Sequence, residues 1–393
     1  MKQLIKLIPD WANIIYSGLR YDETETYRTV RHIFRSLWIY FTIMNDKFES
    51  NIKDQTIKSF KKDLEKISHF QMDFFPLILL YHDIGRPFNR EWHTFESAKI
   101  IQQRKVIQKL NINSLQELIL TGVIRHHLLP GTIFTGESSY YGASSLYNDK
   151  ELGDIWLSYE NIEIFFHTLM AFTIIDIWGY DYSKIYDHYF SYYKQIRDNL
   201  IRVFGKVNSL EQKDRQIYLY QELSKLDNLN LKWRIACALR IFQFVNTRSY
   251  LTEEFYFAKI DEGLNNRNQN WNDFASSLGF EHSLIQFKYA LPIMMVLASG
   301  NFARKPFDPK EKILPGIFNF WQTCTTIVRN FKIKTNTLIK NNHLLWNFIF
   351  NLPRGWFVQS KKVKYVLSDR FLNDIKESSI IFDSDLESYL VKI

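Results

Sequence analysis

The chain is poor in cysteine, proline and glycine. Its 393 residues include 2 cysteines, 9 prolines and 14 glycines. Because Cys237 and Cys324 lie far apart in the sequence, they can form neither a disulfide framework nor a cysteine-rich zinc site. Runs that alternate apolar and polar residues are also scarce, which argues against a sheet-rich fold. These absences favour a mainly helical protein of the reducing cytoplasm.

The sequence also predicts no apolar run long enough to cross a membrane. The stretch from Tyr289 to Ala298 is too short and contains Pro292. The first fifteen residues show neither the apolar core nor the small-residue cleavage site of a secretory signal. We therefore expect a soluble cytoplasmic protein without a transmembrane segment.

Apolar residues are abundant and follow a helical period. They make up 46% of the chain, and aromatic residues make up 16%, which is enough for a large core. Apolar residues recur at spacings of three and four in HIFRSLWIYFTIM, FFPLILLYHDI, IEIFFHTLMAFTIIDIW and LKWRIACALRIFQFV. We predict an all-α protein with one domain over residues 1–200 and a largely helical region over residues 201–393. We expect one or two short strands within residues 355–368.

The segment from Leu128 to Asp154 differs from its surroundings because it is rich in glycine, serine and tyrosine. We predict a long loop between two helices here, and loops of this length often act as lids. Tyr140, Tyr141 and Tyr147 within it could stack on a base.

Histidine and aspartate residues stand at the ends of several predicted helices. His82 and Asp83 close an apolar helix just before a Gly-Arg-Pro turn, and the last turn of a helix can distort so that both side chains face one ion. Asp176 lies in an almost wholly apolar helix, where a carboxylate needs a partner. Histidine and carboxylate groups are the usual ligands of divalent transition metals. The sequence therefore predicts a metal site, with candidates His32, His82, Asp83, His93, His126, His127 and Asp176.

Over about residues 24–190, this arrangement resembles the HD-domain superfamily of metal-dependent phosphohydrolases. The family pattern is a histidine, a His-Asp pair and a distal aspartate, in that order on a helical bundle. The corresponding residues here are His32 in RHIFR, His82 and Asp83 in LLYHDIGRP, and Asp176 in TIIDIWGYD. Arg86 stands where the family more often has lysine. The resemblance implies an HD-type helical bundle in which these four residues bind a metal.

Members of this family that hold two metals use further histidines between the His-Asp pair and the distal aspartate. His93 and His126 match those positions in order, and His127 could replace or join His126. The resemblance thus implies one or two divalent transition-metal ions (Mn, Fe, Ni, Co or Zn), bridged by Asp83 where there are two. Two such ions can activate a water molecule for in-line displacement at phosphorus.

Several arginines lie close in sequence to the proposed ligands. Guanidinium groups match phosphate oxygens in geometry and in charge, and the formal net charge of +8 also favours anions. We expect Arg35, Arg86 and Arg125 to act with Asp83 in catalysis. The predicted function is hydrolysis of a phosphomonoester or phosphodiester, with a nucleotide as the phosphorylated substrate.

Other functions are compatible with the same residues. The ligand order also serves di-iron oxygenases in a minority of the superfamily, and a degenerate, metal-free domain would act as a non-catalytic signalling module. His93-x-x-Glu96 is typical of the deoxynucleotide triphosphohydrolase branch, but Arg86 stands where that branch has a histidine. The sequence leaves the branch and the oligomeric state open. His167, on an aromatic helix face, fits a core histidine better than a ligand.

The C-terminal region has a basic and aromatic segment. Residues 329–376 hold ten Lys or Arg against two Asp, and aromatic residues are interleaved among them. Basic and aromatic side chains together can bind single-stranded nucleic acid. The same composition also fits a core helix with a solvated basic face. The aromatic candidates are Trp346, Phe348, Phe350, Trp356 and Tyr365.

Overall fold

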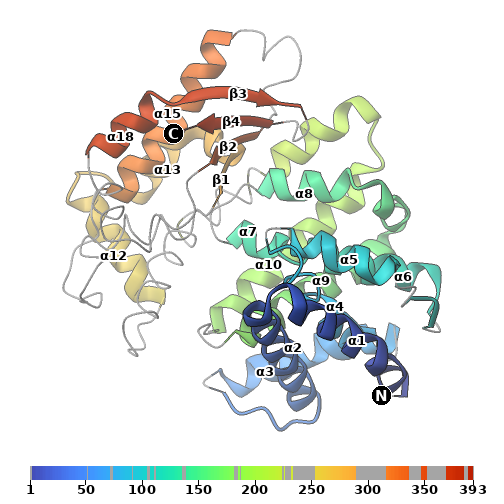
Figure 1. Cartoon of the computed structure of the whole chain (residues 1–393). Helices are drawn as coiled ribbons and strands as arrows, with labels where there is room; N and C mark the ends of the chain where they lie inside the picture. The colour runs from blue at the N-terminus through green and yellow to red at the C-terminus, as the bar shows by residue number, and fades with distance from the viewer. Residues whose placement is uncertain are drawn as a thin grey trace. The chain divides into compact units, whose positions relative to one another are not determined.

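The computed structural model divides the chain into two compact units (Figure 1). The first comprises Met1–Gly131 and Ser145–Leu210, and the second comprises Thr132–Ser144 and Glu211–Ile393. The sequence predicts a boundary near residue 200. The structure describes residues 2–50, 52–70, 74–90, 92–103, 107–109, 112–134, 139–180, 185, 187–223, 225, 232, 253–288, 316–335, 347–351, 369–384 and 388–392.

The first unit is built from helices, as the spacing of apolar residues predicts. Local signals set several of their ends. The Asp22 side chain accepts a hydrogen bond from the Glu25 backbone at the start of α2, and Asn113 forms a reciprocal capping box with Gln116 at the start of α6. The helices are α1 (Lys2–Tyr21), α2 (Glu23–Met44), α3 (Asp54–Phe70), α4 (Phe74–Tyr81), α5 (His93–Gln103), η1 (Ile107–Lys109), α6 (Ser114–His126), α9 (Tyr159–Gly179) and α10 (Asp187–Val207).

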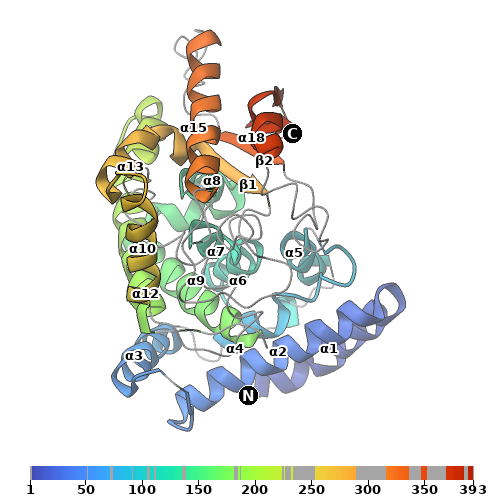
Figure 2. The same ribbon diagram turned by 90° about the vertical axis from the view of Figure 1, so that its left-hand side faces the viewer.

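Helix α9 forms the centre of this unit. It packs against α2, α3, α4, α6 and α10 (Figure 2). Because of this packing, 16 of its 21 residues are buried. By length and composition it is the one helix among the described residues that could cross a membrane, but 89% of its apolar window is buried inside the protein. A helix that is apolar on all sides and surrounded by other helices is typical of a domain core.

The predicted loop from Leu128 to Asp154 is wrong, because its described residues are mostly helical. They form α7 (Leu129–Phe134), α8 (Ser139–Tyr147) and the start of η2 (Lys150–Leu157). Leu146 of α8 is fully buried, and the Tyr147 hydroxyl donates a 2.7 Å hydrogen bond to Asn208. Tertiary contacts of this kind outweigh the weak helix propensity of a segment rich in glycine and serine.

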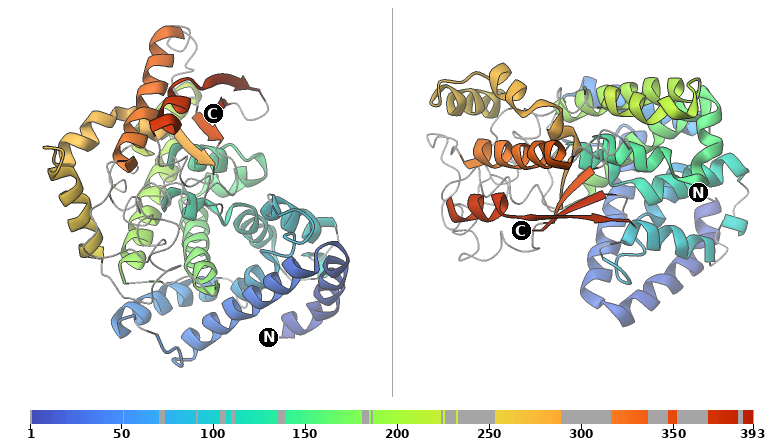
Figure 3. Two further views of the ribbon diagram at one scale, coloured as in Figure 1. Left: turned by 60° about the vertical axis from the view of Figure 1, so that its left-hand side comes forward. Right: turned by 90° about the horizontal axis from the view of Figure 1, so that it is seen from above.

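The second unit combines helices with a small mixed sheet. The strands run in the order β1-β2-β4-β3, with β1, β2 and β4 parallel and β3 antiparallel to β4. Phe331 of α15 packs on Phe348 and Tyr389 of the sheet, and α18 lies beside α15 (Figure 3). The elements are α12 (Glu253–Asn265), α13 (Trp271–Leu278), η3 (Gly279–Leu284), β1 (Ile285–Lys288), α15 (Gly316–Thr335), β2 (Asn347–Asn351), α18 (Asp369–Lys376), β3 (Ser379–Asp383) and β4 (Ser388–Lys392).

Parts of the sequence predictions fall outside the described residues. They are the expected strands within residues 355–368, most of the apolar helix predicted over residues 231–245, and three of the aromatic candidates for nucleic-acid binding, Trp346, Trp356 and Tyr365. The other two candidates, Phe348 and Phe350, are fully buried in β2. These two rings belong to the core of the sheet and are not available for stacking on bases.

Candidate metal centre

Five segments of the first unit bring six of the predicted ligands together. His32 lies in the middle of α2, and Asp176 lies in the last turn of α9. His82 and Asp83 follow the end of α4, while His93 begins α5 and His127 caps the end of α6. All six residues are at most 8% exposed. The cluster therefore lies in the core of a helical unit, although its members span about 145 positions of sequence.

Gly85 makes room for the close approach of α5 to the His-Asp pair. A Cβ atom at this position would lie 2.5 Å from the Ser97 backbone nitrogen and 2.6 Å from the His93 carbonyl oxygen. Because both are backbone atoms, neither can rotate away. The Gly85 amide donates a 2.9 Å hydrogen bond to the Ser97 hydroxyl, which holds the turn against α5. Glycine is therefore required at position 85 because any side chain would clash with the backbone of α5, and not because of its backbone dihedral angles.

Three residues, His32, His82 and Asp176, surround one point of the cluster. The Nε2 atom of His32 lies 2.7 Å from Asp176 Oδ1 and 3.1 Å from His82 Nε2. The Nε2 atom of His82 lies 3.2 Å from the same Asp176 oxygen. Asp83 Oδ2 completes the group, at 3.7 Å from His82 Nε2 and 4.0 Å from His32 Nε2.

The other oxygen of Asp83 faces a different pair of histidines. Asp83 Oδ1 lies 3.3 Å from His93 Nε2 and 3.8 Å from His127 Nε2. Two sets of three residues thus offer donor atoms within 4.8 Å of one another, and Asp83 belongs to both sets. Each set can hold a metal ion.

The orientation of three imidazoles is fixed by the backbone. The Nδ1 atoms of His82, His93 and His127 lie 2.9, 3.1 and 2.8 Å from the carbonyl oxygens of residues 79, 90 and 124. In the neutral ring, Nδ1 then carries the proton and donates it, so the lone pair of Nε2 points into the cluster. The rings of His82 and His127 also pack on Phe172 of α9.

Electron-rich atoms therefore face one another inside the protein. The lone pair of His93 Nε2 points toward Asp83 Oδ1, which is buried without a hydrogen-bond partner. Buried polar atoms nearly always have partners, and converging lone pairs repel one another. A cation at the cluster removes this conflict, so the donor set fits a metal ion.

The two carboxylates of the cluster favour a positive charge at His82. Burial alone would lower the pKa of His82, but Asp83 and Asp176 outweigh it and raise the pKa. Burial alone would likewise raise the pKa of Asp83, yet His82 and Arg86 hold it below its usual range. His127, fully enclosed, has its pKa lowered by burial to about 4, so it is a neutral donor at pH 7.

Tyr180 and Arg86 border the cluster on the side of His32. The Tyr180 ring stacks on His32 at 4.0 Å between ring centroids, and its hydroxyl accepts a 2.7 Å hydrogen bond from Arg86. Arg86 also donates to Asp83 Oδ2 at 3.0 Å and forms an ion pair with Glu25 at 3.1 Å. Arg86 is therefore fixed on three sides.

A cavity of about 480 Å³ opens beside His32, and we call it the arginine-lined cavity. Four arginines and one glutamate contribute charged groups to it, so its lining has a net charge of +3. Glu25 is buried and is shared by Arg28, Arg86 and Arg90 at distances of 3.6, 3.1 and 3.9 Å. The lining residues are Glu25, Arg28, Arg31, His32, Arg86, Arg90, Gly179 and Tyr180.

The structure places three of the proposed site residues elsewhere. His126 Nε2 lies 2.8 Å from Asp149 Oδ2, and Arg125 pairs with Asp149 and Glu151. Arg35 is half-buried on α2 and does not line the arginine-lined cavity. The structure thus groups His127, and not His126, with Asp83.

Sequence reasoning missed the contributions of Glu25, Arg28 and Tyr180. Glu25 and Arg28 precede His32 by seven and four positions, so helical spacing places them on the same face of α2. Tyr180 directly follows Gly179, where a Cβ atom would lie 2.1 Å from the Ser36 hydroxyl oxygen. The periodicity of α2 was a usable signal for the first two, whereas the stacking of Tyr180 has no local signature.

A scan against protein-family models, a search of curated proteins and a search of solved structures each returned no match.

Proposed function

We propose that the chain is a metal-dependent phosphohydrolase similar to the HD-domain superfamily, which cleaves a phosphomonoester or phosphodiester of a nucleotide. One observation carries the proposal: Asp83 directs one carboxylate oxygen toward His32 and His82 and the other toward His93 and His127. A carboxylate shared between two sets of histidines is the arrangement that a two-metal hydrolase needs. The order of these residues in the sequence supports the same family.

The residues divide into two ligand sets. His32, His82, Asp176 and Asp83 Oδ2 would hold one divalent ion, and His93, His127 and Asp83 Oδ1 would hold a second. Ligands of this kind suit Mn, Fe, Co, Ni or Zn better than Mg or Ca. When bound, such ions supply a water molecule of lowered pKa and neutralise charge on phosphoryl oxygens.

The residues around the arginine-lined cavity then bind and orient the phosphate. Arg86 and Arg90 border both the cavity and Glu25, so their guanidinium groups are held close to His32 before substrate arrives. Pre-organised guanidinium groups bind phosphate oxygens in a fixed geometry and lower the entropic cost of positioning. Arg28, which is more exposed, adds positive charge at the entrance to the cavity.

Burial of the cluster limits the access of bulk water. Asp83 and His82 are completely buried, and the remaining ligands are nearly so. Charged groups act more strongly on a substrate in such a site than in water, because the local dielectric constant is lower. We infer that the substrate phosphate approaches through the arginine-lined cavity, which reaches the cluster at His32.

The proposal is tested with aryl phosphates and nucleotides as substrates. Purified protein is stripped of metal, reloaded with Mn, Fe, Co, Ni or Zn in turn, and assayed for release of phosphate or of nucleoside. We expect metal-dependent hydrolysis in the wild type and its loss in Asp83→Ala. Asp149→Ala, which removes another histidine-paired carboxylate outside the cluster, should keep its activity.

Two results would overturn the assignment. Hydrolysis that persists unchanged in Asp83→Ala would place the active centre elsewhere. Substrate-dependent consumption of dioxygen by the iron-loaded protein, without release of phosphate, would instead favour the oxygenase chemistry that the same ligand order can serve.

A further inference from the structure

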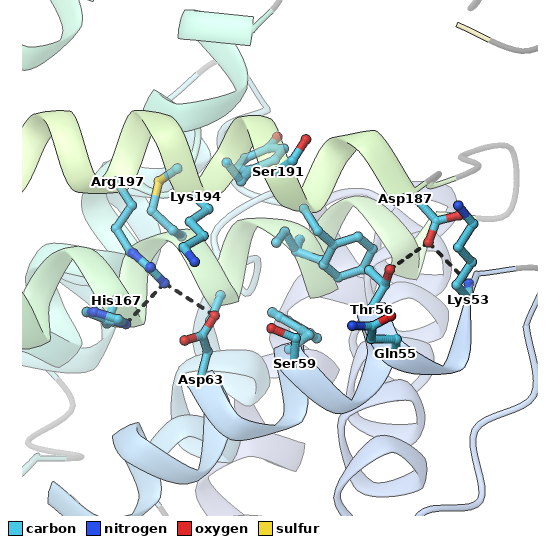
Figure 4. A pocket seen from close by; sticks show the side chains of 16 residues that line it. Lys53, Gln55, Thr56, Ser59, Asp63, His167, Asp187, Ser191, Lys194 and Arg197 are labelled. Atoms are coloured by element: carbon cyan, nitrogen blue, oxygen red, sulfur yellow. Dashed lines mark hydrogen bonds and ion pairs between the residues drawn. The ribbon is translucent and has the colours of Figure 1, made fainter.

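A second cavity lies in the first unit between α3, α9 and α10, and we call it the α3–α10 cavity (Figure 4). Its volume is about 400 Å³, within the range of small-molecule binding sites. None of its lining residues belongs to the metal cluster or to the arginine-lined cavity. Its apolar wall is made by Phe60, Met170, Ala171, Ile174 and Phe190.

Helix α9 separates this cavity from the metal centre. His167, Met170, Ala171 and Ile174 are spaced at i, i+3, i+4 and i+7, so they form one face of the helix, and all four line the cavity. Asp176 follows His167 by nine positions, which at 100° per residue places it on the opposite face. The α3–α10 cavity is therefore a separate site, about 10 Å from the metal cluster across one helix.

The acidic groups of the cavity are already engaged. Asp63 accepts a hydrogen bond from Arg197 at 3.3 Å. Asp187 accepts hydrogen bonds from the Lys53 backbone amide at 3.2 Å and from the Thr56 hydroxyl at 2.7 Å, at the start of α3. Figure 4 shows both carboxylates held in these contacts. The charge of Asp63 is offset by Arg197, whereas Asp187 is held by neutral donors and keeps its negative charge. Together with Lys53, Lys194 and Arg197, these two carboxylates leave the lining with a net charge of +1.

The basic groups include two lysines without an acidic partner among the described residues, Lys53 and Lys194. The Arg197 guanidinium is buried and is shared between Asp63, Asp198 and the Nδ1 atom of His167. Lys194, one turn earlier on α10, is exposed and lines the cavity (Figure 4). Its ammonium group forms no ion pair with any of the residues that the structure describes. Hydroxyl groups of Ser59 and Ser191 lie on the same rim.

We propose that the α3–α10 cavity binds a small organic anion with an aromatic or apolar body. The body contacts the apolar wall on α9, and the acidic group pairs with the ammonium group of Lys194 at the rim. A bare inorganic anion would leave the apolar wall unused, and a neutral ring would leave Lys194 unpaired. The cavity is large enough for an aromatic carboxylate, sulfonate or nucleoside monophosphate.

Binding is measured by titration calorimetry with 2-naphthalenesulfonate, which carries both features and cannot be hydrolysed at phosphorus. Inorganic sulfate and 2-naphthalenemethanol, each with one feature, serve as comparisons. We expect one saturable site for the sulfonate and at least about tenfold weaker binding of either comparison compound. Equal binding of the neutral alcohol, or no saturable binding of the sulfonate below about 1 mM, would overturn the proposal.

Variants then locate the site. Lys194→Ala should weaken sulfonate binding about tenfold, because it removes a charged hydrogen-bond donor. Ser59→Trp, at an exposed position of the rim, should block the cavity and abolish binding without disturbing the core. The matched control is Lys62→Ala, which removes an exposed lysine of α3 that does not line the cavity.

A further control separates this site from the phosphate site proposed above. Arg90→Ala removes a cation of the arginine-lined cavity and should leave sulfonate binding unchanged. Sulfonate binding that survives Ser59→Trp but is lost in Arg90→Ala would show that the probe occupies the metal-centre side, and the α3–α10 cavity would then carry no site. The measurement needs no metal and no turnover, so its outcome does not depend on the proposed hydrolase activity.

Discussion

Replacement of Asp83 by asparagine is the most direct test of the metal centre. Asp83 is completely buried, and its two oxygens face the two histidine sets separately. Asparagine keeps the size of the side chain but removes the charge and one of the two acceptor oxygens. Because the residue belongs to both sets, the substitution should weaken both ion sites at once.

The size of the effect follows from ligand linkage. A metal present at about 100 times its dissociation constant stabilises the folded state by about 2.7 kcal/mol. The first unit has roughly 200 residues, for which 1 kcal/mol corresponds to about 2–4 °C in Tm, so the wild type should gain about 5–11 °C on metal addition. In Asp83→Asn, a hundredfold loss of affinity would leave about 0.4 kcal/mol of this linkage term, so the gain should fall below about 2 °C. A tenfold loss would leave about 1.4 kcal/mol, or about 3–6 °C.

The measurement compares shifts in Tm and not the Tm values themselves. Without metal, the variant leaves Arg86 with one charged partner fewer, so its own Tm can fall for an unrelated reason. Chelator-treated protein is therefore melted in a calorimeter with and without each metal, and bound metal is counted by elemental analysis. Asp149→Asn is the matched control, since it also removes a carboxylate that contacts a histidine and an arginine.

The reasoning would be refuted by either of two results. One is an unchanged metal-dependent shift in Asp83→Asn. The other is a wild type that shows no shift and no bound ion with any of the five metals.

Three further substitutions test neighbouring parts of the site. Gly179→Ala should lower Tm and weaken metal binding. The new methyl group would lie 2.1 Å from Ser36 Oγ and 2.8 Å from the His32 ring, and overpacking of this kind destabilises a protein by about 1–3 kcal/mol. An unchanged Tm would contradict this geometry. Partial burial would raise the pKa of Asp149, but hydrogen bonds from His126 and Arg125 lower it to about 2. The ionised form of Asp149 therefore stabilises the folded state above about pH 4, and this contribution is lost as the pH falls toward 2. In denaturant titrations, Asp149→Asn should lower the free energy of unfolding by about 1–2 kcal/mol at pH 7 and should leave it unchanged near pH 2. Arg86→Gln should raise KM for a phosphorylated substrate and retain bound metal, and loss of the metal in this variant would reassign Arg86 to holding Asp83 in place.

The choice between His126 and His127 shows where sequence reasoning ended. The two residues are adjacent at the end of α6, and neighbouring helical positions point about 100° apart, so only one can face the cluster. Which one does so depends on how the last turn of α6 meets α9. His127 takes αR dihedral angles at the C-cap and packs on Phe172, while His126 turns toward Asp149. Neither contact is local in sequence.

Helical spacing alone could not show which arginines of α2 line the cavity. The spacing from His32 places both Arg28 and Arg35 near its face of α2, four positions before it and three after it. The arginine-lined cavity opens toward the N-terminal side of His32, so Arg28 lines it and Arg35 does not. Helical periodicity specifies the face of a helix but does not say at which end of the ligand a cavity will form.

The helical core was the most predictable part of the fold. The apolar periodicity of α2, α4 and α9 placed these helices, and the need of Asp176 for a partner in an apolar helix was met by His32 and His82. The sheet of the second unit was not predictable. Its strands have only four or five residues, and short apolar segments of that length cannot be distinguished from pieces of a buried helix.

Because His167 and Asp176 lie on opposite faces of α9, the number of residues between them sets their relative orientation about the helix axis. Between His167 and Asp176 the helix completes two and a half turns, and each residue added or removed there would rotate one end against the other by 100°. A single-residue deletion in this interval would thus swing Asp176 away from His32 even if every other contact were kept. The length of this segment is therefore fixed to the residue, whereas its apolar side chains could be exchanged for others of similar volume.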